Sequence, residues 1–367
     1  MIGVIRALAV GTAGGALCFA VGVPTPWLAG SLVATIVAIY SNQKLVLPTV
    51  LQTVAFILLG IQTGTAVNTE TVARAAQWPL SIVCLGVTVM FIVWACMFYY
   101  ERYRYWNRPT ALFASLPGAL SIVILLASTS GADMRRVTIS QCVRLFFLIA
   151  ALPAVIVFIS PATIEGASTT VIASAYEIAI LVVASAAAGL LFAWLKVPAG
   201  LILGAALMSA ALGLGGVVHG GAPDSILIPA NIILGVMIGL RFKGISLPEL
   251  RISLSDGFAG FVIAMVIAMV GAVVTSVVAD LPFALTLLAF APGGLEAMTI
   301  MAFALNLDPA YVAAHQVARY IGLVVLNGSF VRGFNRARSS ALRNPTPAAL
   351  RPAGRDARGR ASRTRYR

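Results

Sequence analysis

The sequence carries the same pattern twice, about 175 residues apart, within an almost wholly apolar chain. Pro24 and Gly30 return as Pro198 and Gly204. The further matches are Gly60 and Gly64 with Gly235 and Gly239, Pro117 and Gly118 with Pro292 and Gly293, and Gln141 and Arg144 with Gln316 and Arg319. Because prolines, glycines and arginines recur rather than interchangeable aliphatic residues, we infer a duplicated unit. Internal repeats in membrane proteins are typical of transporters.

Composition excludes a soluble globular protein. The chain is 60% hydrophobic and only 10% charged, whereas soluble domains carry about 25% charged residues. Runs such as 81–100 and 261–279 are continuously apolar over a membrane-spanning length, unlike the alternating strands of a β-barrel. The sequence therefore predicts an all-α integral membrane protein.

Apolar segments predict five membrane-spanning helices in each half of the chain. In the first half the predicted spans are 3–21, 27–41, 48–67, 78–100 and 138–159. In the second half they are 171–194, 199–217, 226–240, 256–279 and 311–331. Short spans with glycines at matched places in both halves are typical of discontinuous helices at a transporter's binding site.

Two further apolar stretches, 110–130 and 283–305, carry a Pro-Gly pair near their middle. Arginines flank the first stretch on both sides, so the positive-inside rule predicts a loop that enters from the cytoplasm and returns. The helix before the second stretch ends at Asp280 without a basic neighbour, and only one further crossing brings the arginine-rich tail inside. The second stretch is therefore predicted to be re-entrant from the outside. Eleven or twelve spans remain the alternative if a Pro-Gly stretch crosses fully.

This topology gives each repeat five transmembrane helices plus one re-entrant or broken helix. Because five is odd, the second repeat is predicted to be inverted relative to the first, with both termini cytoplasmic. The expected organisation is a first membrane repeat at 1–165, a second at 166–334 and a disordered basic cytoplasmic tail at 335–367. Residues 332–367 contain 11 Arg and one Asp, which is +10 of the net charge of +13. We interpret this tail as a topology anchor and expect no specific nucleic-acid binding.

Arg144 and Arg319 occupy matched positions in the last predicted helix of each repeat. An arginine at the centre of a membrane helix costs about 3 kcal/mol on insertion scales, so both are expected to face the bundle interior. One hypothesis is that they bind a substrate anion, because a guanidinium offers forked donors to a carboxylate. The alternative is that they hold carbonyl groups of the re-entrant backbone, or a carboxylate.

The Pro-Gly breaks supply the remaining candidate site residues. A break at membrane depth frees backbone groups, which predicts substrate binding near Gly118, Gly293, Gly294 and Ser121; a packing kink is the alternative. Glu296 follows the second break and is a candidate ion-coupling group, or else the partner of Arg319 or His315. His315, one turn before Arg319 on the same helix face, is the second ion-coupling candidate, or else a hydrogen-bonded structural group.

Several classes of chemistry have no supporting pattern. The four cysteines lie in apolar runs without paired spacing, which predicts core residues and no disulfide or metal cluster. The sequence has no phosphate-binding GxxxxGK[ST] segment and only two histidines. We expect no cofactor, no metal site and no enzymatic activity.

The segments GVPTPWLAGSL, LLGIQTGTAV, LPGAL, APGGLEAMTIMA and HQVARY together resemble the bacterial AbrB duplication family of membrane proteins. The likeness covers nearly everything before the basic tail. Members are labelled as regulators of gene expression or as ammonia monooxygenase-related proteins, and the family is similar to the inverted-repeat cation/proton antiporters and anion transporters. The resemblance implies a multi-pass protein of the bacterial inner membrane. This sequence lacks a paired-aspartate antiporter pattern, which leaves the coupling ion open.

The sequence therefore predicts a secondary transporter of a small organic anion or similar metabolite, with cation coupling open. Its expected partners are the lipid bilayer and a small-molecule or ion substrate, with a homodimer left open. The alternative is a membrane-bound regulator of gene expression that acts through a partner contacting the tail. A monooxygenase role is disfavoured because a copper site needs several histidine ligands.

Overall fold

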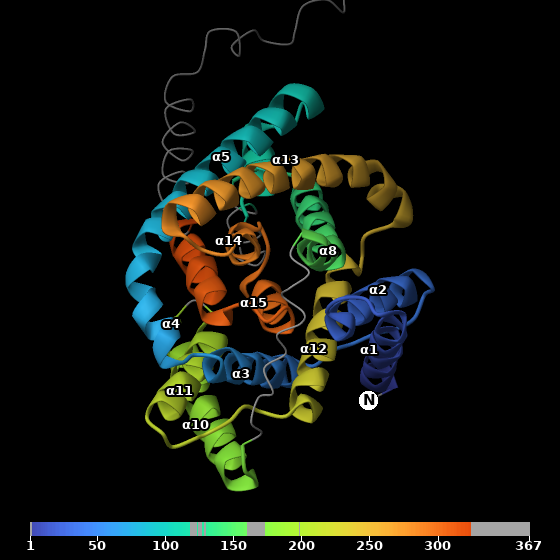
Figure 1. Ribbon diagram of the computed structural model, residues 1–367. Coiled ribbons are helices and arrows are strands. Elements are labelled where there is room, and N and C mark those ends of the chain that lie inside the picture. The colour runs from blue at the N-terminus through green and yellow to red at the C-terminus, as the bar shows by residue number, and fades with distance from the viewer. Residues whose placement is uncertain are drawn as a thin grey trace, which may run out of the picture. The chain divides into compact units, whose positions relative to one another are not determined.

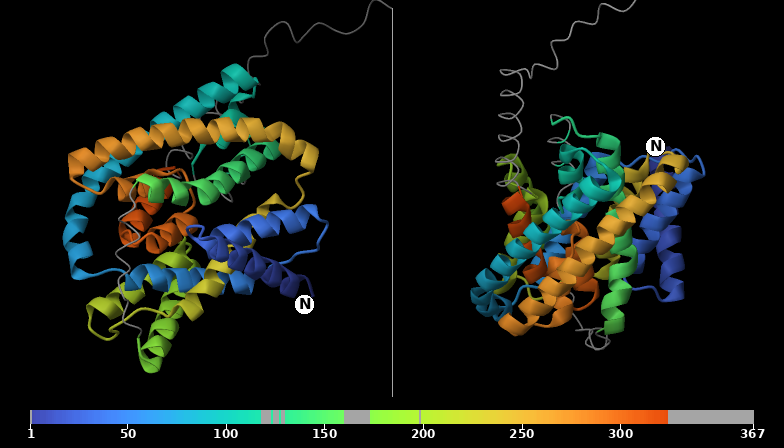
Figure 2. Two further views of the ribbon diagram at one scale, coloured as in Figure 1. Left: turned by 45° about the vertical axis from the view of Figure 1, so that its right-hand side comes forward. Right: turned by 90° about the horizontal axis from the view of Figure 1, so that it is seen from above.

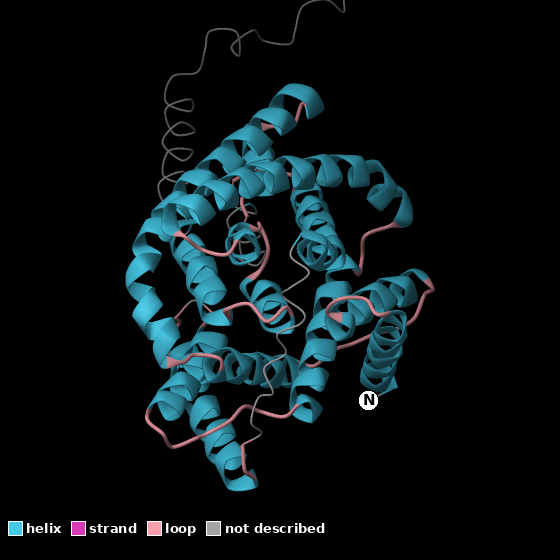
Figure 3. Ribbon diagram, viewed as in Figure 1, coloured by secondary structure: helices cyan, strands magenta, loops and turns pink. Residues whose placement is uncertain are grey.

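The computed structural model describes residues 2–117, 123, 127, 130–159, 173–197 and 199–323. Within these ranges all regular secondary structure is helical and no β-strand is present (Figure 3). The first half contains α1 (Ile2–Val21), α2 (Pro26–Tyr40), α3 (Thr49–Thr65), α4 (Thr69–Arg74), the 3₁₀ turn η1 (Ala75–Gln77), α5 (Trp78–Arg104), α6 (Arg108–Ser115) and α8 (Met134–Ile159). The second half contains α10 (Ala175–Trp194), α11 (Gly200–Leu214), α12 (Asp224–Gly239), η2 (Leu240–Phe242), α13 (Leu247–Ala279), α14 (Phe283–Phe290), α15 (Leu295–Ala304) and helical residues 309–323.

Long apolar helices make this a membrane-embedded protein. In the described part of the chain, six segments have the length and composition to cross a membrane: α1, α5, α8, α10, α13 and Asp224–Phe242. Large apolar side chains project from their outer surfaces, including Trp94 on α5 and Val277 on α13, which are 67% and 78% exposed. Surfaces of this kind require lipid contact, because monomeric soluble proteins rarely expose large apolar patches. The all-helical membrane class predicted from the sequence is thus confirmed.

Each predicted span overlaps an observed helix, although residues 171–172 and 324–331 lie outside the described residues, and several helices extend beyond the predicted membrane boundary. The largest difference is α13, which begins at Leu247 instead of residue 256. Ser246 and Glu249 form a reciprocal capping box at its start, so the helix begins among polar residues before it reaches its apolar part. A hydropathy criterion locates the apolar part of a helix and not its cap, which explains the difference.

Helices α14 and α15 occupy the centre of the bundle. Figure 1 shows them surrounded by α3, α5, α8, α12 and α13, and the turned views in Figure 2 place the same red and orange segments in the middle. Every residue of α14 after Phe283 is buried. The stretch 283–305 is therefore two short helices separated by a break, as the Pro-Gly pair predicted.

The two halves make equivalent contacts with one another. Helix α3 packs on α11, and its counterpart α12 packs on α2. A Cβ atom added to Gly60 would lie 2.6 Å from the Cβ of Ala205, and one added to Gly235 would overlap the hydroxyl of Ser31. Since Ser31 and Ala205 are themselves 174 positions apart, the duplicated glycines have duplicated neighbours. These glycines therefore permit close helix packing.

Helices α5 and α13 run antiparallel across the bundle. Near the middle of α5, Thr88 lies against Gly271, whereas near its end Tyr100 lies against Gly260. The Tyr100 hydroxyl donates to the backbone carbonyl of Asp256 at 3.4 Å. Residue numbers thus rise along α5 as they fall along α13, which brings the start of α5 to the end of α13.

Candidate functional site

The break between α14 and α15 is a short extended segment in the bundle interior. Helix α14 ends at Phe290, and α15 begins after Gly294, whose lack of a side chain leaves this helix end without a side-chain cap. Pro292 has no backbone N–H, and the two glycines that follow it disfavour a continuous helix. Carbonyl groups around the break therefore need partners from elsewhere in the protein.

Gln316 and Arg319 of the last helix supply those partners. The Gln316 amide donates to the Ala289 carbonyl at 3.2 Å, and Nη1 of Arg319 donates to the Ala291 carbonyl at 2.7 Å. Nη2 of Arg319 donates to the Gly293 carbonyl and to Oε1 of Gln316. One glutamine–arginine pair, three residues apart on one helix, thus binds the carbonyls on both sides of Pro292.

The first half repeats this arrangement at the end of α6. The Gln141 amide donates to the carbonyls of Phe113 and Leu116, each at 2.9 Å. Arg144 on α8 donates through Nη2 to the Leu116 carbonyl at 3.2 Å and to Oε1 of Gln141. The carbonyl-binding role that the sequence left open for both arginines is therefore present. Gly118 and Ser121 lie outside the described residues.

The carbonyl contacts use only part of each guanidinium. A guanidinium has five N–H donors, and the described contacts of Arg319 use three of them. The buried Nε of Arg144 has no hydrogen-bond partner. Unsatisfied buried donors are uncommon in native structures, so each one requires an explanation.

The two arginines are buried without a neutralising carboxylate. Each side chain is 6% exposed, and the two guanidinium groups lie within range of mutual electrostatic repulsion. Among the described residues, the ion pairs are Arg104–Asp256, Arg108–Glu101, Arg135–Glu249, Arg136–Asp133 and His219–Glu177. None of these pairs includes Arg144 or Arg319. The surroundings of these two arginines, at the end of α6 and at the break between α14 and α15, are consequently rich in positive charge.

Glu296 lies at the same break as Arg319. It is in the first turn of α15 and is partly exposed. Its Oε2 lies 3.0 Å from the point that a Cβ on Gly294 would occupy, and the carbonyl of neighbouring Gly293 binds Arg319. In the described part of the chain Glu296 forms no ion pair with Arg319 or His315, so the partner role considered from the sequence is absent.

His315 is fully buried and bound by two neighbours. Its Nδ1 is 2.8 Å from the Tyr311 carbonyl, and its Nε2 is 2.7 Å from Oγ of Ser81 on α5. The Tyr311 ring lies against the imidazole, with centroids 3.9 Å apart and the ring planes tilted by 33°. These contacts give His315 the hydrogen-bonded structural surroundings that the sequence kept as an alternative to an ion-coupling role.

A polar cavity lies at one end of the bundle. Its volume is about 840 Å³, and it is lined by the ends of α3, α11 and α15, by α4 and by the start of α12. Asp308, in its wall, accepts hydrogen bonds from the backbone N–H groups of Ala310 and Tyr311. Burial raises the pKa of the Asp308 carboxyl above its ordinary value, although these N–H groups and the charge of Arg74 act in the opposite direction.

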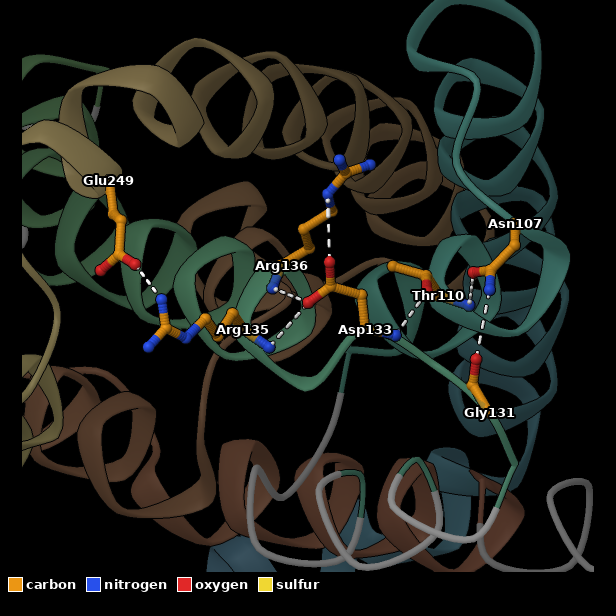
Figure 4. Close-up of polar contacts among 7 residues, drawn as sticks. All are labelled: Asn107, Thr110, Gly131, Asp133, Arg135, Arg136 and Glu249. Atoms are coloured by element: carbon orange, nitrogen blue, oxygen red, sulfur yellow. Dashed lines mark hydrogen bonds and ion pairs between the residues drawn. The ribbon is translucent and has the colours of Figure 1, made fainter.

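A hydrogen-bonded network joins the start of α6 to the start of α8 (Figure 4). Asn107 caps α6 by accepting from the Thr110 N–H at 3.1 Å, and its amide donates to the Gly131 carbonyl at 3.1 Å. The Asp133 N–H donates to the Thr110 hydroxyl at 2.8 Å. Arg135 continues the network to Glu249 at the start of α13. Residues 107 and 133 therefore lie close together, so the intervening segment begins and ends on the same side of the bundle.

Sequence reasoning missed three of the residues that complete these sites. Gln141 and Gln316 were visible as repeat-matched positions three residues before each arginine, which is the signal that could have identified them. Ser81, the partner of His315, had no such signal because it is one of several serines in apolar helices. Within the described residues, no three His, Cys, Asp or Glu side chains are grouped as a metal site, and all four cysteines are free.

Comparison with known proteins covers most of the chain. The family described as "Transition state regulatory protein AbrB" matches residues 27–335. A protein of Escherichia coli K12 named "Putative regulator AbrB" is 25% identical over 325 residues, covering 85% of this chain and 91% of the relative. "Uncharacterized protein YhjN" of Bacillus subtilis 168 is 24% identical over 351 residues, covering 89% and 91%.

Proposed function

The chain belongs to the AbrB family of membrane proteins, and we propose that it is a secondary transporter of small organic anions that works by alternating access. The observation that carries the proposal is the pair of buried, repeat-matched arginines at the end of α6 and at the break between α14 and α15, neither of which pairs with a carboxylate among the described residues. An uncompensated charge in a membrane protein is costly and is usually functional. A small carboxylate bound near both arginines would offset their positive charge. Its oxygens would accept hydrogen bonds from the remaining guanidinium N–H groups.

Contacts between the ends of different helices support the proposed ten-span topology. Arg135–Glu249 and Arg104–Asp256 join segments predicted to be cytoplasmic. On the predicted outer side, His219 pairs with Glu177 at 3.2 Å. Each of these contacts connects two positions that the proposed topology places on one face of the membrane.

The contacts also support re-entrant Pro-Gly stretches. The network of Figure 4 brings the beginning and end of 107–133 together. The start of α5 lies near the end of α13, and Trp78 at the start of α5 packs on Tyr311 with ring centroids 6.0 Å apart. The chain thus enters α14 and leaves α15 near the same end of the bundle. Two repeats with five crossings each would then be inverted.

The cavity favours an outward-facing state for the structure. The cavity-lining segments 65–74, 213–224 and 303–309 are all on the predicted outer side. On the predicted cytoplasmic side, Lys243 donates to the Leu45 carbonyl at 3.2 Å, and Arg135 pairs with Glu249. Alternating access requires one open and one closed side, and this arrangement fits that requirement.

A regulator of gene expression is the second candidate. It is favoured by the family description, by the name of the Escherichia coli relative and by the 11 arginines of residues 332–367. A regulator that acts through a partner contacting this tail needs no substrate flux. The two candidates therefore differ in whether the tail or the membrane part is required.

Reconstitution of the full-length protein in liposomes tests the proposal. The probes are radiolabelled acetate, lactate, succinate and citrate, with a parallel preparation that lacks residues 336–367. A transporter gives protein-dependent uptake of at least one probe, and the shortened protein retains it. Absence of uptake of every probe by the intact, folded protein, with changes in gene expression that depend on the tail, would favour the regulator.

A further inference from the structure

The fixed charges at the two breaks do not cancel. Arg144 and Arg319 contribute two positive charges and Glu296 contributes one negative charge, with His315 counted in its neutral form. We infer that Glu296 sets the valence of the transported anion, so that the site takes a monovalent carboxylate and disfavours dianions. This inference rests on the proposed function and specifies the substrate class of the same site.

Glu296 is positioned to act on a bound anion. Its carboxylate lies beside Gly294, one residue after the carbonyl that Arg319 binds. Tyr320, the residue after Arg319, lies within electrostatic range of Glu296. The acidic group and the guanidinium of Arg319 are therefore at one break, although they form no ion pair with each other. An anion bound by the arginines would lie in the field of all three charges.

Two other acidic residues of the bundle already have partners. Asp256 pairs with Arg104, and Asp308 is bound by backbone N–H groups and lies in the field of Arg74. The segments 118–129 and 324–331, largely outside the described residues, contain no Asp, Glu, Lys, Arg or His in the sequence. The net count of one positive charge therefore rests on Arg144, Arg319 and Glu296.

One positive charge matches one negative charge on the substrate. In a poorly solvated site an uncompensated charge is unfavourable, so a monovalent anion brings the site to neutrality. A dianion leaves one excess negative charge and is also repelled more strongly by Glu296. For unit charges about 8 Å apart at an effective dielectric constant near 20, one such repulsion changes affinity by roughly 30-fold.

The test compares the uptake of monovalent and divalent anions by the full-length protein. Proteoliposomes of wild type, Glu296→Gln and the control Glu101→Gln are supplied with radiolabelled lactate, acetate, succinate and malate, and with labelled chloride as an inorganic monoanion. Glu101 is a suitable control because it is a partly buried glutamate on α5 that pairs only weakly, at 3.9 Å, with Arg108. We expect wild type to favour monocarboxylates over dicarboxylates at least 10-fold. The Glu296→Gln protein should reduce that ratio by roughly 30-fold, and Glu101→Gln should leave it unchanged.

Each other outcome contradicts a defined part of the inference. Equal uptake of succinate and lactate by wild type, or an unchanged ratio in Glu296→Gln, refutes the valence role while transport stands. Loss of uptake of every anion in a folded Glu296→Gln protein assigns Glu296 to the transport cycle instead. Chloride uptake as fast as lactate uptake contradicts the carboxylate class. If wild type carries no anion, the proposed function itself fails. The wild-type ratio decides the question even if the variant does not fold.

Discussion

Replacing Arg319 by glutamine separates the structural contribution of this residue from that of its charge. The substitution removes the hydrogen bonds to the Ala291 and Gly293 carbonyls and to Gln316. It also removes a positive charge from the centre of a membrane helix. The first change destabilises the folded protein and the second stabilises it, so their magnitudes decide whether the variant folds.

The loss of these hydrogen bonds and the removal of the buried charge have nearly equal and opposite effects on the free energy of unfolding. Hydrogen bonds inside membrane proteins contribute about 0.6 kcal/mol on average and rarely more than about 1.7 kcal/mol, so two carbonyl bonds account for about 1–3 kcal/mol. Burying an arginine at the centre of a helix costs about 3 kcal/mol. We therefore expect the free energy of unfolding of Arg319→Gln to lie within about 2 kcal/mol of wild type. Anion uptake should fall by about 10- to 100-fold, because one charge-assisted bond contributes about 1.5–3 kcal/mol.

The assay measures uptake and stability on the same preparation. Uptake of labelled lactate and succinate in proteoliposomes is compared with reversible unfolding in lipid–detergent mixtures, with Arg108→Gln as the control because the Arg108 side chain is 72% exposed. Arg319→Lys keeps the charge and should recover part of the flux. Flux within two-fold of wild type at equal protein would remove Arg319 from the binding site. A stability loss above about 4 kcal/mol would show that our estimate of the carbonyl bonds is wrong.

Three further predictions concern packing, topology and pH. Gly235→Leu should prevent stable packing of α12 on α2, because its Cβ overlaps Ser31, whereas Gly86→Leu on open surface should unfold like wild type in the same denaturation assay. Reporter fusions after Arg108, Gly166, Asp280 and Arg338 should read inside, outside, outside and inside, and two reversed readings would refute the inverted repeats. The raised pKa of Asp308 means that the folded state binds its proton more tightly than the unfolded state. The resulting stabilisation of the folded state is present below the ordinary Asp pKa and is lost as pH rises through the pKa of Asp308 in the folded state. Asp308→Asn should flatten the pH dependence of unfolding in that window; an unchanged curve would contradict the assignment.

Much of the fold could be predicted because the hydropathy pattern and the internal repeat both extend over whole helices. Runs of about 20 apolar residues can only be helical in a membrane, and Pro292 followed by two glycines in such a run favours a break. Helix ends were less predictable. The capping box at Ser246 starts α13 well before its apolar part, and α4 depends on a local cap at Asn68.

The site could be predicted only in part, because its acceptors are backbone atoms. The matched arginines were evident from the sequence, but the carbonyls of Leu116, Ala291 and Gly293 that they bind carry no side-chain signal. The neighbours of Glu296 and His315 likewise depend on how helices cross. Ser81 lies 234 positions from His315, and no spacing rule connects residues across that distance.

The contacts of Arg319 give a physical reason for substrate binding and helix movement to be coupled. One guanidinium joins the last helix to the carbonyls on both sides of the break between α14 and α15. A carboxylate bound to the remaining N–H donors would also compete with the carbonyls for this guanidinium, because an ion pair with hydrogen bonds is stronger than a bond to a neutral carbonyl. In the proposed transport cycle, binding of an anion would therefore weaken the attachment of the last helix to the break, and release would restore it. A ligand shifts a conformational equilibrium only through such a difference in contacts between states, and the duplicated pair Gln141 and Arg144 supplies the same difference at the other break.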